Sequence, residues 1–388
     1  MDSGQTPTFE YIQTEQALAN LLERLQESQT ITLDTEADSF HHYYPKVCLI
    51  QGTVGPLNFI LDPLANIGLD GFFKILSQKD LILHDAGYDL RMLKADFNFE
   101  PKGRVFDTML AARLVGLEKV GLSALLADFL GVQVQKKNQR ADWSKRPLPD
   151  ELLRYAIIDT YYLPALADLL AGKLENFNRT QWHQQCCAWS VRAALHSKNS
   201  TNHKNEELWR ISGVSRLKSR EMAFFRELWR WREKEAQKAN VPPFRVMYSK
   251  QMLAISEWAA AQKNPLSKEL TRLPRNCRGQ RLAALKKALE KAYLMPQDQW
   301  PTQKKPDSSR QPVYEQQVQI EKLRNRVAQI GASVNLPPQF IAPKATLASI
   351  VLRKLNTLEK LLDSDLLSPW QAELLAGAVE EIFGEKTG

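Results

Sequence analysis

The sequence predicts an α/β domain, in which helices cover a mixed β-sheet, followed by two all-α helical domains. Apolar runs typical of buried strands occur at 31–33, 47–50, 57–61 and 80–83, all within the first 200 residues. Helical spacing of apolar residues begins near Thr14, Leu69, Gly87, Thr108, Ser123 and Pro149. Strands that come first and helices that come later, with some interleaving, indicate a mixed sheet covered by helices.

Two polar segments divide the chain. The first is HSKNSTNHKNEE at 196–207, and the second is PQDQWPTQKKPDSSRQP at 296–312. After the first segment the strand pattern ends, and only helical patterns continue. A chain of 388 residues also exceeds the usual size of one domain. We therefore expect domains at 1–200, 208–293 and 314–388.

Charge is distributed unevenly over these parts. The net charge is +8, and counting Lys and Arg against Asp and Glu gives −4 for 1–200, +13 for 201–310 and −1 for 311–388. A basic segment behind an acidic one suggests a polyanion that one part holds and another part processes. Basic helices with solvated faces would produce the same pattern, so charge alone does not decide between the two interpretations.

The composition favours a cytoplasmic protein with no membrane partner. No apolar stretch is long enough to span a bilayer, and the first residues do not form a signal peptide. The four cysteines, Cys48, Cys186, Cys187 and Cys277, lack the spacing of zinc ligands. We expect free thiols.

Acidic residues follow two of the predicted strands. Asp34 and Glu36 come directly after the first strand, two residues apart, so they project from the same face. Asp89 lies about one turn into the helix after the strand at 80–83. Tyr155 and Asp159 are four apart and share a helix face. Each pattern alone has an ordinary explanation, such as a strand that ends in a solvated turn.

Together the four carboxylates indicate a metal site. Asp34, Glu36, Asp89 and Asp159 would repel one another if they converged, and divalent cations remove that repulsion. Mg²⁺ and Mn²⁺ prefer carboxylate oxygen and water as ligands. The six histidines are too scattered to indicate zinc.

These motifs resemble those of the DEDD family of 3′→5′ exonucleases, in the tyrosine subgroup, and most closely its ribonuclease D members. The resemblance rests on Asp34-x-Glu36, on Asp89 within HDAGYD, and on Tyr155-x-x-x-Asp159. It extends over DTEADSFHHYYPKVCLIQ at 34–51, FDTMLAARL at 106–114 and KKNQRADWSKRPL at 136–148. Segment 208–293 resembles the helicase-and-RNase-D C-terminal (HRDC) domain, and 314–388 resembles a divergent second copy. The family implies a ribonuclease H-like fold for the first domain.

The resemblance implies a metal-dependent 3′→5′ exoribonuclease that releases nucleoside 5′-monophosphates and trims tRNA precursors at their 3′ ends, as a monomer. Two divalent cations, Mg²⁺ or Mn²⁺, would be the cofactors. Asp34, Glu36 and Asp159 would hold one, while Asp34 and Asp89 would hold the other. Tyr155 would orient the attacking water. The alternatives are a DNA 3′→5′ exonuclease and a catalytically inactive nucleic-acid-binding protein.

Substrate contacts are predicted from two segments. Phe40, His41 and Tyr44 follow the first acidic motif and would stack on the terminal bases, or else pack against the sheet. Lys136, Arg140 and Arg146 would contact phosphates, whereas Trp143 is expected in the core. The sequence assigns no role to Asp85 beyond a possible helix cap, and none to Tyr88. Basic residues of the middle domain are Arg210, Arg216, Lys218, Arg220, Arg272, Arg275, Arg278 and Arg281, and Trp229 and Trp231 are expected in its core.

Overall fold

The computed structural model describes residues 7–134, 140–196, 207–263, 277, 279–303 and 312–384. The chain forms two compact units. The first, here called the sheet unit, contains Met1–Ala37, Val47–Ser197 and Ser309–Gly388. The second, here called the helical unit, contains Asp38–Lys46 and Lys198–Ser308.

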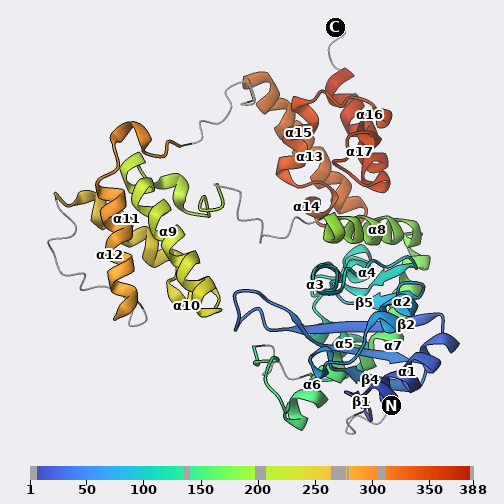
Figure 1. Cartoon of the computed structure of the whole chain (residues 1–388). Helices are drawn as coiled ribbons and strands as arrows, with labels where there is room; N and C mark the ends of the chain where they lie inside the picture. The colour runs from blue at the N-terminus through green and yellow to red at the C-terminus, as the bar shows by residue number, and fades with distance from the viewer. Residues whose placement is uncertain are drawn as a thin grey trace. The chain divides into compact units, whose positions relative to one another are not determined.

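The sheet unit is built around a six-stranded mixed sheet, as the sequence predicts (Figure 1). The strand order is β1-β4-β3-β2-β5-β6. Strand β2 pairs with β3 and β3 pairs with β4 in antiparallel fashion, while β1–β4, β2–β5 and β5–β6 are parallel. The strands are β1 (Glu10–Ile12), β2 (Thr30–Ala37), β3 (Val47–Val54), β4 (Leu57–Leu61), β5 (Asp80–Leu83) and β6 (Val105–Asp107).

Helices cover the sheet on both faces. Their bounds are α1 (Glu15–Glu27), α2 (Asp70–Leu76), α3 (Gly87–Phe97), α4 (Thr108–Leu114), α5 (Leu122–Leu130), α6 (Asp150–Tyr161), α7 (Leu163–Asn176) and α8 (Thr180–His196). Ile31 and Leu33 of β2 are fully buried in one core with α1, α2 and α3. Helix α6 packs on β2, β3 and β4 through a separate core that includes Leu49 and Ile60. The alternation along β2 therefore points successive side chains to two different cores.

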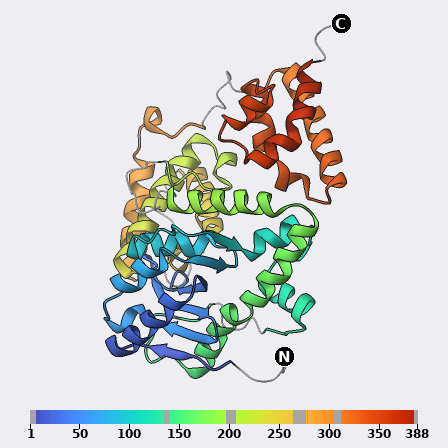
Figure 2. The ribbon, with the colours of Figure 1, turned by 90° about the vertical axis from the view of Figure 1, so that its right-hand side faces the viewer.

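The C-terminal helices belong to the sheet unit. They are α13 (Tyr314–Ser333), α14 (Pro338–Ile341), α15 (Lys344–Leu352), α16 (Leu358–Leu362) and α17 (Pro369–Gly384). Their apolar side chains share one core with those of α4, α5 and α7, and α17 contacts α8. Figure 2 shows these C-terminal helices, in orange to red, gathered into one bundle. Trp182 and Trp370 stack with ring centroids 4.8 Å apart, and the backbone N–H of Trp370 donates to Gln185 Oε1 (2.8 Å). Arg179 donates to the carbonyl oxygens of Leu114 and Val334.

The helical unit contains α9 (Ser219–Ala239), α10 (Pro243–Val246), α11 (Ser249–Ala261) and α12 (Gln280–Tyr293). Its core contains Trp209, Phe224 and Trp231, and Trp229 packs against that core, which confirms the expectation for Trp229 and Trp231. The segment Asp38–Lys46, which links β2 to β3, belongs to this unit, and Tyr43 packs against the same core.

No helix in the described part of the chain is long and apolar enough to cross a membrane. The four cysteines are free thiols, as expected.

Candidate active site

Strand β2 places two carboxylates on one face of the sheet. Asp34 lies opposite Gln51 of β3, and Glu36 lies opposite Leu49. The pairing with β3 shifts between Glu36 and Ala37, where the chain leaves the strand for the segment Asp38–Lys46. Both carboxylates thus stand at the end of β2, on the face that α6 covers.

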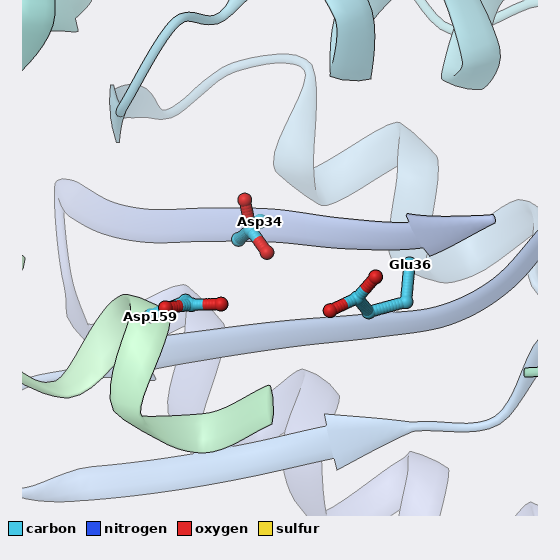
Figure 3. Close-up of side chains that lie close together, drawn as sticks. All are labelled: Asp34, Glu36 and Asp159. Carbon is cyan, nitrogen blue, oxygen red and sulfur yellow. The ribbon is translucent and has the colours of Figure 1, made fainter. Parts of the chain in front are cut away.

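Helix α6 brings the third carboxylate to this face. Leu153, Ala156 and Ile157 bury the helix against Leu49, and Asp159 follows on the next turn. Figure 3 shows the carboxylates of Asp34, Glu36 and Asp159 turned toward one another. One ligand atom from each lies within 4.8 Å of the other two. Across the residues that the structure describes, this is the one group of three or more His, Cys, Asp or Glu side chains so arranged.

Asp89 is held beside this group by a different contact. It lies in the first turn of α3 and is 5% exposed. Its Oδ1 accepts hydrogen bonds from the backbone N–H and the hydroxyl of Thr35, at 3.2 and 2.5 Å. Thr35 sits between Asp34 and Glu36 in the strand and points to the opposite face. Three of the four predicted carboxylates therefore lie together in the structure. The fourth, Asp89, is held beside them by its hydrogen bonds with Thr35.

Burial raises the pKa of all four carboxyl groups, and the charges of neighbouring carboxylates add to this effect. Burial raises the pKa of Asp89 to about 7, although the hydrogen bonds from Thr35 oppose the increase. Burial and the charge of Asp89 raise the pKa of Asp159 to about 7. The pKa values of Asp34 and Glu36 are also well above their ordinary values, first through burial and then through neighbouring carboxylates. Four acids in such surroundings favour a positive charge among them.

The donor set fits a hard divalent cation. All the candidate ligand atoms are carboxylate oxygens, which Mg²⁺ and Mn²⁺ prefer. Gln51 Nε2 donates to Asp34 Oδ2 (2.6 Å) and orients that carboxylate. The Gln51 side-chain oxygen is buried and has no partner in the described protein. A buried oxygen without a hydrogen-bond partner, next to carboxylates, is consistent with a site that binds a ligand or an ion.

Tyr155 lies on α6 one turn before Asp159. Its ring stacks on the ring of Trp143, with centroids 6.3 Å apart and planes 28° apart. Trp143 is buried, as the sequence predicts. The Trp143 contact fixes the plane of the phenol on the helix that carries Asp159.

Arg146, predicted to bind phosphate, uses its guanidinium within the protein. It donates to both oxygens of Asp62, at 2.6 Å each, and to the carbonyl oxygens of Trp143, Lys145 and Cys48. These bonds fasten the segment that carries Trp143 to the sheet. Arg140 is exposed, while Lys136 lies outside the described residues. A role for these three in substrate binding stays a prediction.

Asp85 and Tyr88 lie at the start of α3. The N-cap of that helix is Ala86, which has no side-chain cap, so Asp85 does not serve as the cap. Instead, Asp107 accepts hydrogen bonds from the backbone N–H groups of Asp85 and Ala86, at 3.2 and 2.9 Å. Tyr88 packs under Arg91, with 5.6 Å between the guanidinium carbon and the ring centroid.

Phe40, His41 and Tyr44 belong to the helical unit. Phe40 is 45% exposed and Tyr44 is 51% exposed, so both rings present surface to solvent. Contact of these side chains with the terminal bases stays a prediction.

Two residues at the site are absent from the sequence-based set. Thr35 and Gln51 contact the acids, yet neither residue type indicates metal chemistry. The one signal for Gln51 in the sequence is that an amide side chain interrupts the strongly apolar part of the run VCLIQGTV. Such a residue needs a hydrogen-bond partner across the sheet.

Comparisons with known proteins identify two domains in the chain. Residues 9–175 match the family model described as 3'-5' exonuclease, and residues 221–269 match the HRDC domain. Ribonuclease D of Gluconacetobacter diazotrophicus is 30% identical over 261 residues, covering 66% of this chain and 65% of the relative. Ribonuclease D of Haemophilus influenzae is 27% identical over 360 residues, covering 89% and 85%.

Solved structures show the same fold. The structure of Escherichia coli RNase D has a TM-score of 0.71 at 22% identity and covers 98% of this chain and 100% of that chain. A protein from Bifidobacterium adolescentis has a TM-score of 0.78 at 23% identity, with 97% of each chain covered.

Fold, acidic cluster and family models together define a 3′–5′ exonuclease domain joined to an HRDC domain. The chain is similar to ribonuclease D proteins, which it matches over 66% and 89% of its own length in the two relatives above. The match spans 65% of the length of the Gluconacetobacter relative and 58% of the length of a ribonuclease D from Shewanella sp. (strain ANA-3).

Proposed function

We propose that this protein is a metal-dependent exoribonuclease that hydrolyses RNA from the 3′ end and releases nucleoside 5′-monophosphates. The observation that carries the proposal is the cluster of Asp34, Glu36 and Asp159, whose ligand atoms lie within 4.8 Å of one another inside a 3′–5′ exonuclease domain. Such a set of partly buried oxygen donors suits phosphodiester hydrolysis, where charge develops on the attacking and leaving oxygens.

The proposed cofactors are two divalent cations, Mg²⁺ or Mn²⁺. Asp34, Glu36 and Asp159 would hold one, and Asp34 together with Asp89 would hold the other. When bound, a pair of cations lowers the pKa of a water and stabilises the leaving oxygen. The raised pKa values of Asp89 and Asp159 support this role, because a cation offsets the repulsion that burial intensifies.

The remaining residues orient the reacting groups. Gln51 holds Asp34 through the 2.6 Å hydrogen bond to its Oδ2. Tyr155, fixed against Trp143, presents its hydroxyl from the helix that carries Asp159. A phenol with a pKa of about 10 is a poor base at neutral pH, so Tyr155 orients the water rather than deprotonating it.

RNA, and tRNA precursors in particular, are the proposed substrates. The E. coli relative is described as an exoribonuclease involved in structured RNA processing. In the helical unit, Lys218, Lys286 and Lys287 are exposed and can neutralise phosphates. We place this activity in the cytoplasm and assign it to a monomer.

The test compares RNA and DNA oligomers of the same sequence, each labelled at the 5′ end, with Mg²⁺, Mn²⁺ or EDTA. We expect a ladder that shortens from the 3′ end of RNA with either metal, nucleoside 5′-monophosphates as products, and no cleavage in EDTA. A ladder on DNA but not on RNA would favour the DNA exonuclease. Binding of RNA with no cleavage under any metal condition would favour the inactive binding protein.

A further inference from the structure

The segment Asp38–Lys46, here called the aromatic loop, has a defined internal structure. It begins directly after Ala37, two residues beyond Glu36. Asp38 is fully buried, and its Oδ1 accepts from the backbone N–H of Lys46 (2.8 Å). The Asp38 carbonyl oxygen accepts from His41 N–H (2.8 Å) and His42 N–H (3.0 Å). A buried acid thus closes the loop on itself at its base.

One face of α9 holds the tip of this loop. Tyr43 donates its hydroxyl to Glu233 Oε2 (3.0 Å), and Gln237 Nε2 donates to the same hydroxyl (3.1 Å). Asn240 Oδ1 accepts from the backbone N–H groups of Tyr43 (3.2 Å) and Tyr44 (3.5 Å). Residues 233, 237 and 240 are four and three apart, so they share one helix face.

The groups that make these contacts are themselves fixed. Glu233 Oε1 pairs with Arg232 (2.8 Å), which leaves Oε2 for Tyr43. Burial raises the pKa of Tyr43, so its hydroxyl stays protonated and donates. Asn240 ends α9 in the left-handed conformation, with φ of 45°, which directs its side chain away from the helix. Arg245 also contacts His41 Nδ1 (2.9 Å).

Anchoring one tyrosine leaves the neighbouring rings exposed. Tyr43 is half-buried and packs against the core of the helical unit, while Phe40 and Tyr44 remain 45% and 51% exposed. The rings of Tyr43 and Tyr44 meet edge to face, with centroids 4.9 Å apart, so the anchored ring of Tyr43 supports the exposed ring of Tyr44. Exposed rings held in this way provide stacking surfaces for bases at low entropic cost.

We propose that Asn240, together with Glu233 and Gln237, is a positioning residue for RNA hydrolysis: through it the HRDC domain holds the aromatic loop in the conformation that receives the RNA 3′ end. The three residues lie within the segment 221–269 that matches the HRDC domain. The inference rests on the proposed function. According to this proposal, the HRDC domain does more than bind RNA through its positive charge. It also positions the aromatic loop for each round of cleavage.

The test removes the Asn240 acceptor without disturbing the backbone. Glycine adopts positive φ without strain, so Asn240→Gly deletes only the side chain. Each hydrogen bond contributes about 0.5–1.5 kcal/mol, so we expect KM for a short single-stranded RNA to rise about 3- to 10-fold, with kcat nearly unchanged. Hydrogen exchange at the Tyr43 and Tyr44 amides should become faster.

Two variants serve as controls in the full-length protein. Asn240→Asp keeps an acceptor oxygen and should retain KM close to that of the wild type. Asn178→Gly changes another exposed asparagine with positive φ, 57°, and should alter neither KM nor loop exchange. Unchanged exchange in Asn240→Gly would overturn the anchoring, and faster exchange with unchanged KM would overturn the effect on substrate. A wild-type protein that does not hydrolyse RNA would instead contradict the proposed function.

Discussion

Gln51 is a buried amide on the strand opposite Asp34, and its hydrogen bond fixes one oxygen of that carboxylate. Groups that orient metal ligands typically change metal affinity about 10–100-fold when they are removed. In the Gln51→Met variant, which keeps the volume and loses the donor, we expect the apparent Mg²⁺ constant for activity to rise within that range. Activity should recover at high Mg²⁺ concentration. An unchanged Mg²⁺ dependence would show that Asp34 does not need this contact.

Tyr155 offers a second test at the scale of a single residue. Phenylalanine keeps the ring that stacks on Trp143 and deletes the hydroxyl. Residues that assist proton transfer or orient water contribute about 10²–10⁴-fold, so the single-turnover rate of Tyr155→Phe should fall within that range. RNA binding should be unaffected. Cleavage at the wild-type rate would mean that the tyrosine only packs.

The sequence predicts the acids of the site better than the residues that support them. Spacing and resemblance locate Asp34, Glu36 and Asp159, because strand and helix periodicities determine which side chains share a face. The contacts of Thr35 and Gln51 depend on strand register and helix docking, which no local pattern specifies.

At the scale of elements, the long and strongly apolar segments are predicted correctly. The four predicted strands correspond to β2, β3, β4 and β5, and α1 begins directly after Thr14, close to the predicted start. The sequence pattern does not reveal β1 and β6, because each has three residues, which are too few to show an alternating pattern. Helices α7 and α8 follow α6 closely and were not distinguished from it, since a helical period continues across a short break.

The burial of two carboxyl groups, Asp89 on α3 and Asp159 on α6, makes the metal-free protein sensitive to pH. The pKa values of Asp89 and Asp159 are about 7 in the folded protein, against an ordinary value near 4. Between these values the folded state binds more protons than the unfolded state, so the free energy of unfolding decreases as pH rises from about 4 to 7. Mg²⁺ binds the ionised carboxylates and should offset the loss.

Thermal unfolding at pH 5 and pH 8, each with EDTA or MgCl₂, measures this effect. We expect the increase in Tm on adding Mg²⁺ to be larger at pH 8. An equal increase at both pH values would indicate that the cation does not bind these carboxylates.

At the scale of the whole chain, the C-terminal helices share a core with the exonuclease domain. The polar breaks in the sequence predict a separate domain at 314–388, because contacts between segments far apart in the chain leave no local signal. Trp370 lies at this junction, stacked on Trp182. Truncating a buried tryptophan to alanine typically costs about 3–5 kcal/mol.

Trp370→Ala therefore tests whether the sheet unit unfolds cooperatively. Mg²⁺ should shift the thermal unfolding transition of the part of the protein that contains the acidic cluster. In Trp370→Ala we expect this Mg²⁺-sensitive transition to occur at a lower temperature. Trp209→Ala, in the core of the helical unit, is the matched control and should leave that transition in place. If Trp370→Ala instead produced a new transition and left the Mg²⁺-sensitive one unchanged, the C-terminal helices would fold independently.

The most direct measurement is single-turnover hydrolysis of 5′-labelled RNA by Asp34→Asn, with the RNA dissociation constant measured in parallel. Asp34 contributes to both proposed cation sites, so the variant should fail to shorten RNA while binding it with nearly unchanged affinity. Asp168→Asn, which changes an exposed acid on α7, is the control and should cleave at the wild-type rate. Shortening of RNA by Asp34→Asn at a rate near that of the wild type would contradict hydrolysis by cations held at this cluster.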